Sequence, residues 1–89
     1  MIHPIVKTEK VTVRAASTVQ TNYNAFLIKN NSTGATVYFC EEEQGEASAE
    51  NGFALSPGET LPVLLRCKAL SLAASADADV RLLYIGEGW

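Results

Sequence analysis

The sequence predicts an all-β protein, a compact antiparallel β-sandwich or jelly-roll-like barrel of about seven short strands. Two observations favour this class. Several runs alternate apolar and polar residues and are rich in β-branched residues, and clusters of Gly, Pro, Asn, Asp and Ser separate them. A third observation excludes most helices, because no segment repeats apolar residues at helical spacing over three turns. The strongest helical alternative is LLRCKALSLAASA, residues 64–76.

The first half of the chain contains three predicted strands. KVTVRAA (10–16) alternates, with Val11 and Val13 on one face and Lys10, Thr12 and Arg14 on the other. STVQTNY (17–23) is polar and is expected to be a connection. NAFLIKN (24–30) and ATVYFCE (35–41) are apolar strands that flank the turn NSTG (31–34), a pattern that predicts a β-hairpin.

The second half begins with a polar, acidic loop, residues 41–50. Asn51-Gly52 is expected to form a tight turn with positive φ, and a short strand at 53–55 follows. Ser56-Pro57-Gly58-Glu59 fits a type II turn, with Gly at the position that requires positive φ. Proline cannot donate to a β-ladder, so Pro62 places the strand within 60–67 at an edge or starts it later. The remaining expected elements are strands at 69–75 and 79–86 and a turn at 76–79.

The length of 89 residues indicates a single domain, residues 1–89, with an extended N-terminal arm at 1–8 and a C-terminal tail at 86–89. The N-terminal residues do not resemble a signal peptide, and no apolar run is long enough to span a membrane. We therefore expect synthesis in the cytoplasm and no membrane association. Cys40 and Cys67 are expected to be reduced and packed on strands, with a disulfide as the alternative.

The net charge of −3 is unevenly distributed along the chain. Residues 1–30 carry +3, residues 31–59 carry −6 with no basic residue, and residues 60–89 are neutral. The acidic excess argues against nucleic-acid binding, which requires clustered Lys and Arg. The segregation suggests head-to-tail pairing of copies or docking on a basic partner. The alternative is that the Glu residues only keep one loop soluble.

The sequence offers no reactive site, so we expect no enzyme, no cofactor and no bound metal. The only histidine, His3, lies in the expected N-terminal arm, which disfavours a Ser/His or Cys/His pair. Cys40, Cys67 and His3 do not have the spacing of a zinc site. A calcium site formed by residues 41–43 with Asp77 and Asp79 is the remaining metal alternative, and a solvated loop explains these acids better.

Partner contacts are the remaining candidates for function. Trp89 is a large apolar side chain in the expected C-terminal tail. We expect it to insert into a pocket of a neighbouring subunit, as buried aromatic residues do at the centres of interfaces. Ile2, Ile5 and Val6 form an apolar strip that suits contact with a neighbour, whereas Lys7, Lys10 and Arg14 would steer the approach to an acidic surface. Alternatively, Trp89 folds back over the core of its own chain.

Three stretches in order carry a resemblance to a known group of proteins: AFLIKNNSTGATVYF, NGFALSPGETLPVLL and ALSLAASADADVRLLY. Together they resemble small virion structural proteins of tailed bacteriophages, over residues 25–84. The acidic segment CEEEQGEASAE departs from that group, which has a short Gly/Ser-rich link at this place.

The resemblance implies a non-enzymatic subunit of the phage particle. We expect a capsid decoration (cement) protein that binds the outer surface of the major capsid shell and stabilises it, as a homo-oligomer with a trimer as the first expectation. One alternative is a neck, tail or head-fibre base component of the virion. Another is a carbohydrate-binding β-sandwich with exposed tyrosines, although Tyr23, Tyr38 and Tyr84 lie in apolar strands that favour burial of their rings.

Overall fold

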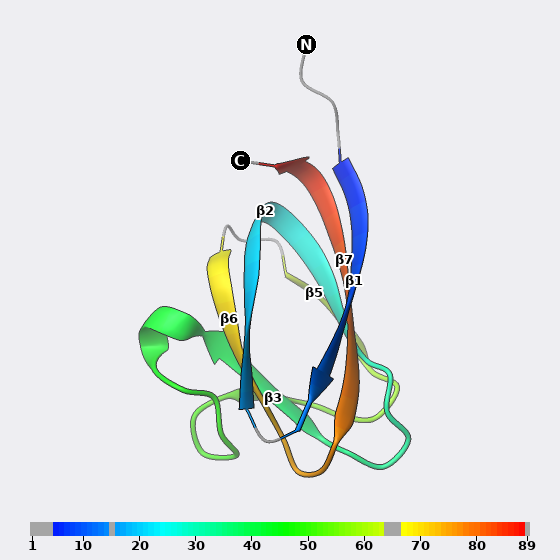
Figure 1. Cartoon of the computed structure of the whole chain (residues 1–89), viewed down its shortest axis with the longest axis vertical. Helices are drawn as coiled ribbons and strands as arrows, with labels where there is room; N and C mark the ends of the chain where they lie inside the picture. Colours follow the sequence, from blue (N-terminus) through cyan, green and yellow to red (C-terminus); the bar gives the residue numbers. More distant parts are fainter. Residues whose placement is uncertain (1–4, 15, 64–66, 89) are drawn as a thin grey trace.

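The protein is an all-β fold, as the sequence predicts (Figure 1). The structure is a computed structural model that describes residues 5–14, 16–63 and 67–88. Its strands are β1 (Ile5–Val13), β2 (Ala16–Asn30), β3 (Val37–Glu41), β4 (Phe53–Leu55), β5 (Thr60–Val63), β6 (Cys67–Ala74) and β7 (Ala78–Gly88), with one 3-10 turn, η1 (Glu42–Gln44). All strand pairs are antiparallel.

Two four-stranded sheets pack against each other and share strand β2. The first part of β2 pairs with β6, and its second part pairs with β7 and β5. Sheet 1 therefore has the order β1-β7-β2-β5, and sheet 2 has the order β2-β6-β3-β4. The pairing register of β2 shifts between Gln20 and Ala25, where the strand passes from one sheet to the other. Such irregularities bend a strand and increase its twist, which allows one strand to serve both sheets.

The core lies between the two sheets and is formed by alternate residues of each strand. Phe26 and Tyr84 of sheet 1 pack with ring centroids 6.1 Å apart and planes at 60°, a tilted arrangement that aromatic rings prefer. The largest fully buried apolar side chains are Tyr84, Phe26, Ile28, Leu55, Leu72, Leu82, Val13, Val37 and Val80. Each such aliphatic or aromatic side chain contributes roughly 1.5–3 kcal/mol by leaving water.

Strand β1 has the predicted alternation, with Val13 buried and Lys10 and Thr12 exposed. It begins earlier than expected. Residues 5–8, assigned from sequence to an arm, pair with β7, and residues 86–88, assigned to a tail, belong to β7. The described parts of the expected arm and tail are therefore sheet strands.

The prediction that residues 17–23 form a connection is wrong, because these residues are part of strand β2. Val19 is buried in the core, whereas Thr18 and Gln20 are exposed. The segment is polar because one of its faces is in water, and a half-exposed strand needs few apolar residues.

The predicted hairpin between residues 24–30 and 35–41 is also wrong. Strand β3 pairs with β6 and β4, and β2 pairs with β5, β6 and β7, so the loop between β2 and β3 crosses from sheet 1 to sheet 2. A short Gly-containing loop fits a hairpin and a crossing equally well, and the sequence signal does not distinguish them.

The type II turn prediction is confirmed: Gly58 has φ of 81°, and Glu59 N–H donates to Ser56 O at 3.0 Å. Gly52, in contrast, does not have positive φ. A Cβ at Gly52 would lie 3.1 Å from Ser48 O and 3.2 Å from Tyr38 Cβ, so close packing requires glycine there.

Two further features of the second half of the chain agree with the sequence. Of the two alternatives for Pro62, the edge position is observed: among the described strands, β5 pairs with β2 alone and is an edge strand of sheet 1. The described part of the helical alternative, residues 67–74, is strand β6.

Candidate interaction surfaces

One end of sheet 1 gathers several of the residues expected to contact a partner. Ile5 pairs with Gly86, Val6 with Ile85 and Lys7 with Tyr84, so β1 begins beside the end of β7 (Figure 1). We call this region the chain-end surface, defined by residues 5–7 and 85–88. Two further expected contacts, Ile2 and Trp89, lie outside the described residues.

The two other cations expected to contact the partner lie away from this end. Lys10 is exposed in the middle of β1, and Arg14 follows the far end of the strand. At about 3.3 Å per residue, Arg14 is roughly 30 Å from Ile5 along the strand. The structure therefore does not bring Arg14 and the chain-end surface into one contact.

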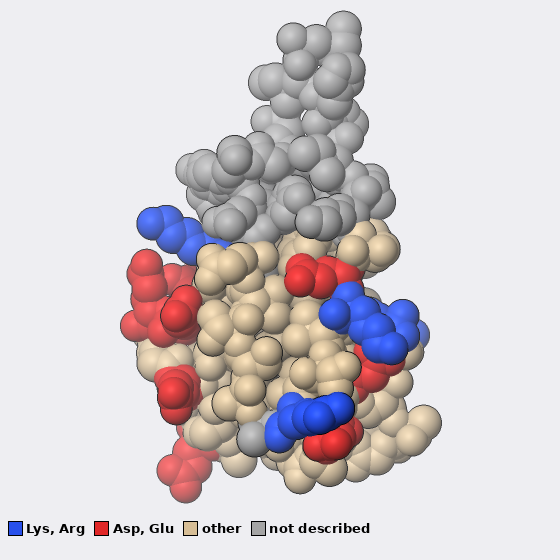
Figure 2. Space-filling model, viewed as in Figure 1, with Lys and Arg blue, Asp and Glu red and all other residues tan. Residues whose placement is uncertain are grey.

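A row of three cations crosses the outer face of sheet 1. Lys10 of β1 is directly opposite Arg81 of β7, which is directly opposite Lys29 of β2. All three side chains are exposed. Directly opposite residues in a sheet have Cβ atoms about 5 Å apart, so this basic row concentrates positive charge across three strands. In Figure 2, one group of basic side chains lies on the right-hand side of the molecule with acidic side chains next to it, and other basic side chains lie at the lower centre and the upper left.

An apolar hollow lies beside the basic row. Leu27 and Leu83 are cross-strand neighbours and are half-buried in the adjacent row of the same face. The hollow has a volume of about 350 Å³ and is lined by Thr8, Glu9, Lys10, Leu27, Lys29, Thr60, Arg81, Leu82 and Leu83. The face thus combines an apolar floor with a rim of three cations and one carboxylate.

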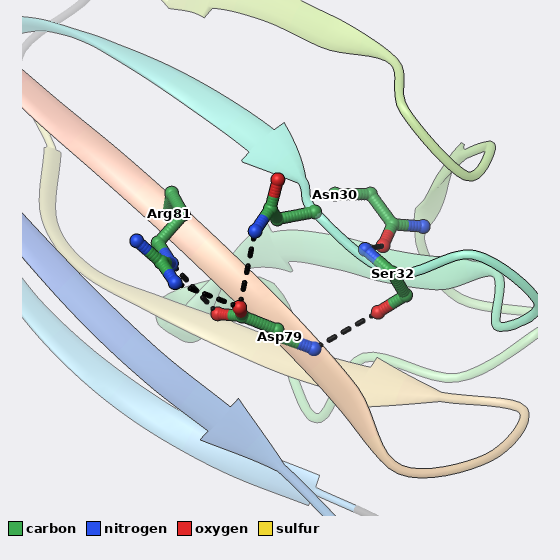
Figure 3. Close-up of polar contacts among 5 residues, drawn as sticks. Asn30, Ser32, Asp79 and Arg81 are labelled. Carbon is green, nitrogen blue, oxygen red and sulfur yellow. Dashed lines mark hydrogen bonds and ion pairs between the residues drawn. The ribbon is translucent and has the colours of Figure 1, made fainter.

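Asp79 partly neutralises the basic row by pairing with Arg81 (Figure 3). Arg81 donates from Nε to Oδ1 at 2.9 Å and from a terminal nitrogen to Oδ2 at 3.0 Å, a bidentate contact. These bonds from Arg81 are the main cause that lowers the pKa of Asp79 to about 2, and Asn31 and Lys10 act in the same direction against the effect of desolvation. Among the described residues, Lys10 and Lys29 have no ion-pair partner.

The acidic loop between β3 and β4, residues 42–52, begins directly after Glu41 of β3 and lies against the outer face of sheet 2. Ala47 N–H donates to Ser71 Oγ of β6 at 2.9 Å, and both residues are buried. Within the loop, Asn51 Nδ2 donates to Glu46 O at 3.0 Å. These bonds hold the backbone while the carboxylates of Glu41, Glu42, Glu43, Glu46 and Glu50 stay exposed. Acidic side chains accordingly gather on the left-hand side of Figure 2.

Phe53 follows the acidic loop directly and is 59% exposed, the largest exposure of a bulky apolar side chain in the described part of the chain. Its ring packs against Phe39 with centroids 5.9 Å apart. An exposed aromatic ring supported by a second ring is a preformed contact point.

Chemistry-bearing groups are not clustered in the part of the chain that the structure describes. No three His, Cys, Asp or Glu side chains there are close enough to hold a metal ion. Cys40 is a free thiol whose Sγ donates to Gly45 O at 3.5 Å. Tyr84 is buried as expected, and its hydroxyl donates to Glu9 Oε1 at 2.6 Å. None of the described segments is a helix of the length and hydropathy that crossing a bilayer requires.

The fold and these surfaces define a β-sandwich whose two outer faces carry opposite charge. Comparison of the chain with family models, with curated proteins and with solved structures gives no significant match.

Sequence reasoning missed four of the residues that form these surfaces: Leu27, Lys29, Arg81 and Phe53. The alternation in residues 25–30 places Leu27 and Lys29 on one face, so part of the signal was present. Which strands lie side by side depends on the strand order of the sheet. The incorrect hairpin prediction paired residues 24–30 with residues 35–41, so it did not place Lys29 beside Arg81.

Proposed function

We propose that this protein is a non-enzymatic virion subunit of a tailed bacteriophage, a decoration (cement) protein that binds the outer surface of the major capsid shell and stabilises it. The ordered resemblance over residues 25–84 and the all-β fold support this function. The proposal concerns adhesion, so it depends on surfaces and not on a reactive centre.

The observation that carries the proposal is the pairing of the start of β1 with the end of β7. Two segments expected from sequence to contact the shell, around Ile5 and before Trp89, therefore lead to one end of sheet 1. The contact surface comprises Ile2, Ile5, Val6, Lys7 and Trp89. Lys10 and Arg14 act at longer range by steering the approach to an acidic shell.

Stabilisation follows from the number of contacts. Each copy adds a small interface at junctions between shell subunits, and many copies together resist outward pressure, because linked weak contacts combine as avidity. A closed cyclic oligomer, with a trimer as the first expectation, matches the symmetry of such junctions.

The first prediction is that purified particles of the phage that encodes this chain carry it in hundreds of copies, as a shell-covering subunit requires. Quantitative mass spectrometry against the major capsid protein measures the ratio. Copies in the tens would instead assign the protein to the neck, the tail or a fibre base. Absence from particles would overturn the virion assignment altogether.

Two variants test the contact surface. Trp89→Ala and deletion of residues 1–4, which leaves β1 whole, should each lower occupancy on particles at least several-fold. Thr33→Ala, an exposed position in the loop between β2 and β3, is the matched control and should bind as the wild type does. Unchanged occupancy of both variants would place the shell contact elsewhere on the protein.

A further inference from the structure

The acidic loop and the basic row are complementary surfaces that a single chain cannot bring together. The basic row lies on the outer face of sheet 1, and the acidic loop lies on the outer face of sheet 2. The packed core separates the two faces. Any contact between these surfaces must therefore join two molecules.

We propose that copies of this chain associate head to tail, with the acidic loop of one copy seated on the basic row of the next. This inference goes beyond the proposed function because it names the two surfaces through which copies contact each other, independently of contact with a shell. The partner of the basic row is thus a second copy of this chain.

Charge complementarity is the first argument. Five exposed carboxylates occur between Glu41 and Glu50, and residues 31–59 contain no basic residue to neutralise them. On the basic row, Lys10 and Lys29 have no ion-pair partner among the described residues. The third cation, Arg81, forms an ion pair with Asp79. Opposed patches of this kind guide encounter and fix the orientation of a complex.

Shape and apolar chemistry give the second argument. Phe53 stands exposed beside the acidic loop, and the hollow floored by Leu27 and Leu83 stands beside the basic row. The hollow is an open depression of about 350 Å³ with the two leucines at its floor. Phe53 lies opposite Phe39 and on the same face of β4 as the buried Leu55, so its exposed ring is at the edge of the inner face and reaches the hollow of the next copy only where the edge of sheet 2 takes part in the contact.

The symmetry of this contact limits the assembly. The two surfaces differ, so the interface is heterologous, and each added copy leaves one loop and one row unused until a ring closes. Because the two surfaces lie on opposite outer faces, repeated contacts of this kind extend as an open filament unless successive copies are rotated enough to close a ring.

Charge reversal tests the inference in solution. The wild type should be larger than a monomer by light scattering at low ionic strength, where contacts between opposite charges are strongest, and should dissociate as salt is added. Lys10→Glu with Lys29→Glu should be monomeric, and so should Glu42→Lys with Glu43→Lys. The matched control, Arg14→Glu with Lys68→Glu, changes the net charge equally at exposed sites outside the row and should associate normally.

The decisive variant combines both reversals in one chain. In this chain Glu41 and Glu46 are also replaced by Lys, so residues 41–50 carry +3 and face a row of −1, and association should return. Carbodiimide crosslinking of mixed isotope-labelled and unlabelled wild-type protein should join Lys10 or Lys29 of one copy to residues 41–46 of another.

Three results would overturn the inference: a monomeric wild type at low salt, association that survives either reversal, or a combined variant that stays monomeric. Circular dichroism establishes that each variant is folded. Particle occupancy is measured separately, so failure of this contact and failure of the proposed function are distinguishable.

Discussion

Asn30 is fully buried at the end of β2, and each of its polar groups has a partner. Its side-chain Nδ2 donates to Ala35 O at 2.7 Å and to Leu55 O at 2.9 Å, and its Oδ1 accepts from Ser32 N–H at 3.1 Å. One side chain therefore fixes the loop that crosses between the sheets and ties it to β4. Buried polar groups with complete hydrogen bonding specify a unique local structure.

We predict that Asn30→Ala destabilises the protein by roughly 2–4 kcal/mol, because two buried carbonyls and one N–H lose their partner. Urea unfolding at equilibrium measures the change. Asn31→Ala is the matched control: its exposed side chain donates only to Asp79 Oδ2, so its cost should be within about 1 kcal/mol. Equal effects of the two substitutions would refute a special role for Asn30.

The ionisation of Asp79 should make the free energy of unfolding depend on pH within a defined range. Arg81 lowers the pKa of Asp79 from its ordinary value of 3.8 to about 2 in the folded protein. A lowered pKa adds stability above the unfolded value, and this contribution is lost as pH falls from about 4 to about 2. Asp79→Asn should therefore lose less stability than the wild type over that interval.

The measurement for Asp79 is the urea midpoint as a function of pH for both proteins. The remaining carboxylates titrate in each and cancel in the difference. Parallel curves from pH 4 to pH 2 would show that the ion pair adds no stability to the fold.

At the scale of elements, the turn between β4 and β5 depends on one backbone conformation. Gly58 has φ of 81°, where a Cβ is unfavourable, and its N–H donates to Asn30 O at 2.7 Å. The turn is therefore tied to the end of β2, and β5 is held at the edge of sheet 1.

We predict that Gly58→Ala destabilises the protein by about 1 kcal/mol, the cost of a side chain in the left-handed region. Gly34→Ala is the control, since Gly34 lacks positive φ and a Cβ there meets no atom within 4 Å. Its effect on thermal unfolding should be near zero or slightly stabilising. A neutral Gly58→Ala would mean that the turn relaxes to another type.

At the scale of the whole molecule, the shared strand β2 determines where charge is displayed. Its first part builds sheet 2, and its second part carries Lys29 to the outer face of sheet 1, opposite Arg81. The loop between β3 and β4 then places the carboxylates over sheet 2. Without the change of sheet within β2, Lys29 would not join Lys10 and Arg81 in one row.

The sequence by itself determined the all-β class, the strands around Val11, Phe26, Phe39 and Leu82, the type II turn at Gly58 and the edge position of Pro62. These features depend on residue chemistry and alternation over a few positions, which are local properties.

Tertiary structure alone decided the neighbours of each strand. The loop after Asn30 crosses between sheets because a buried amide, and not a hairpin ladder, satisfies its backbone. Residues 17–23 became a strand because β6 was available to pair with them. The basic row exists only because three strands distant in sequence align in register, and pairing across such distances depends on the packing of the whole core.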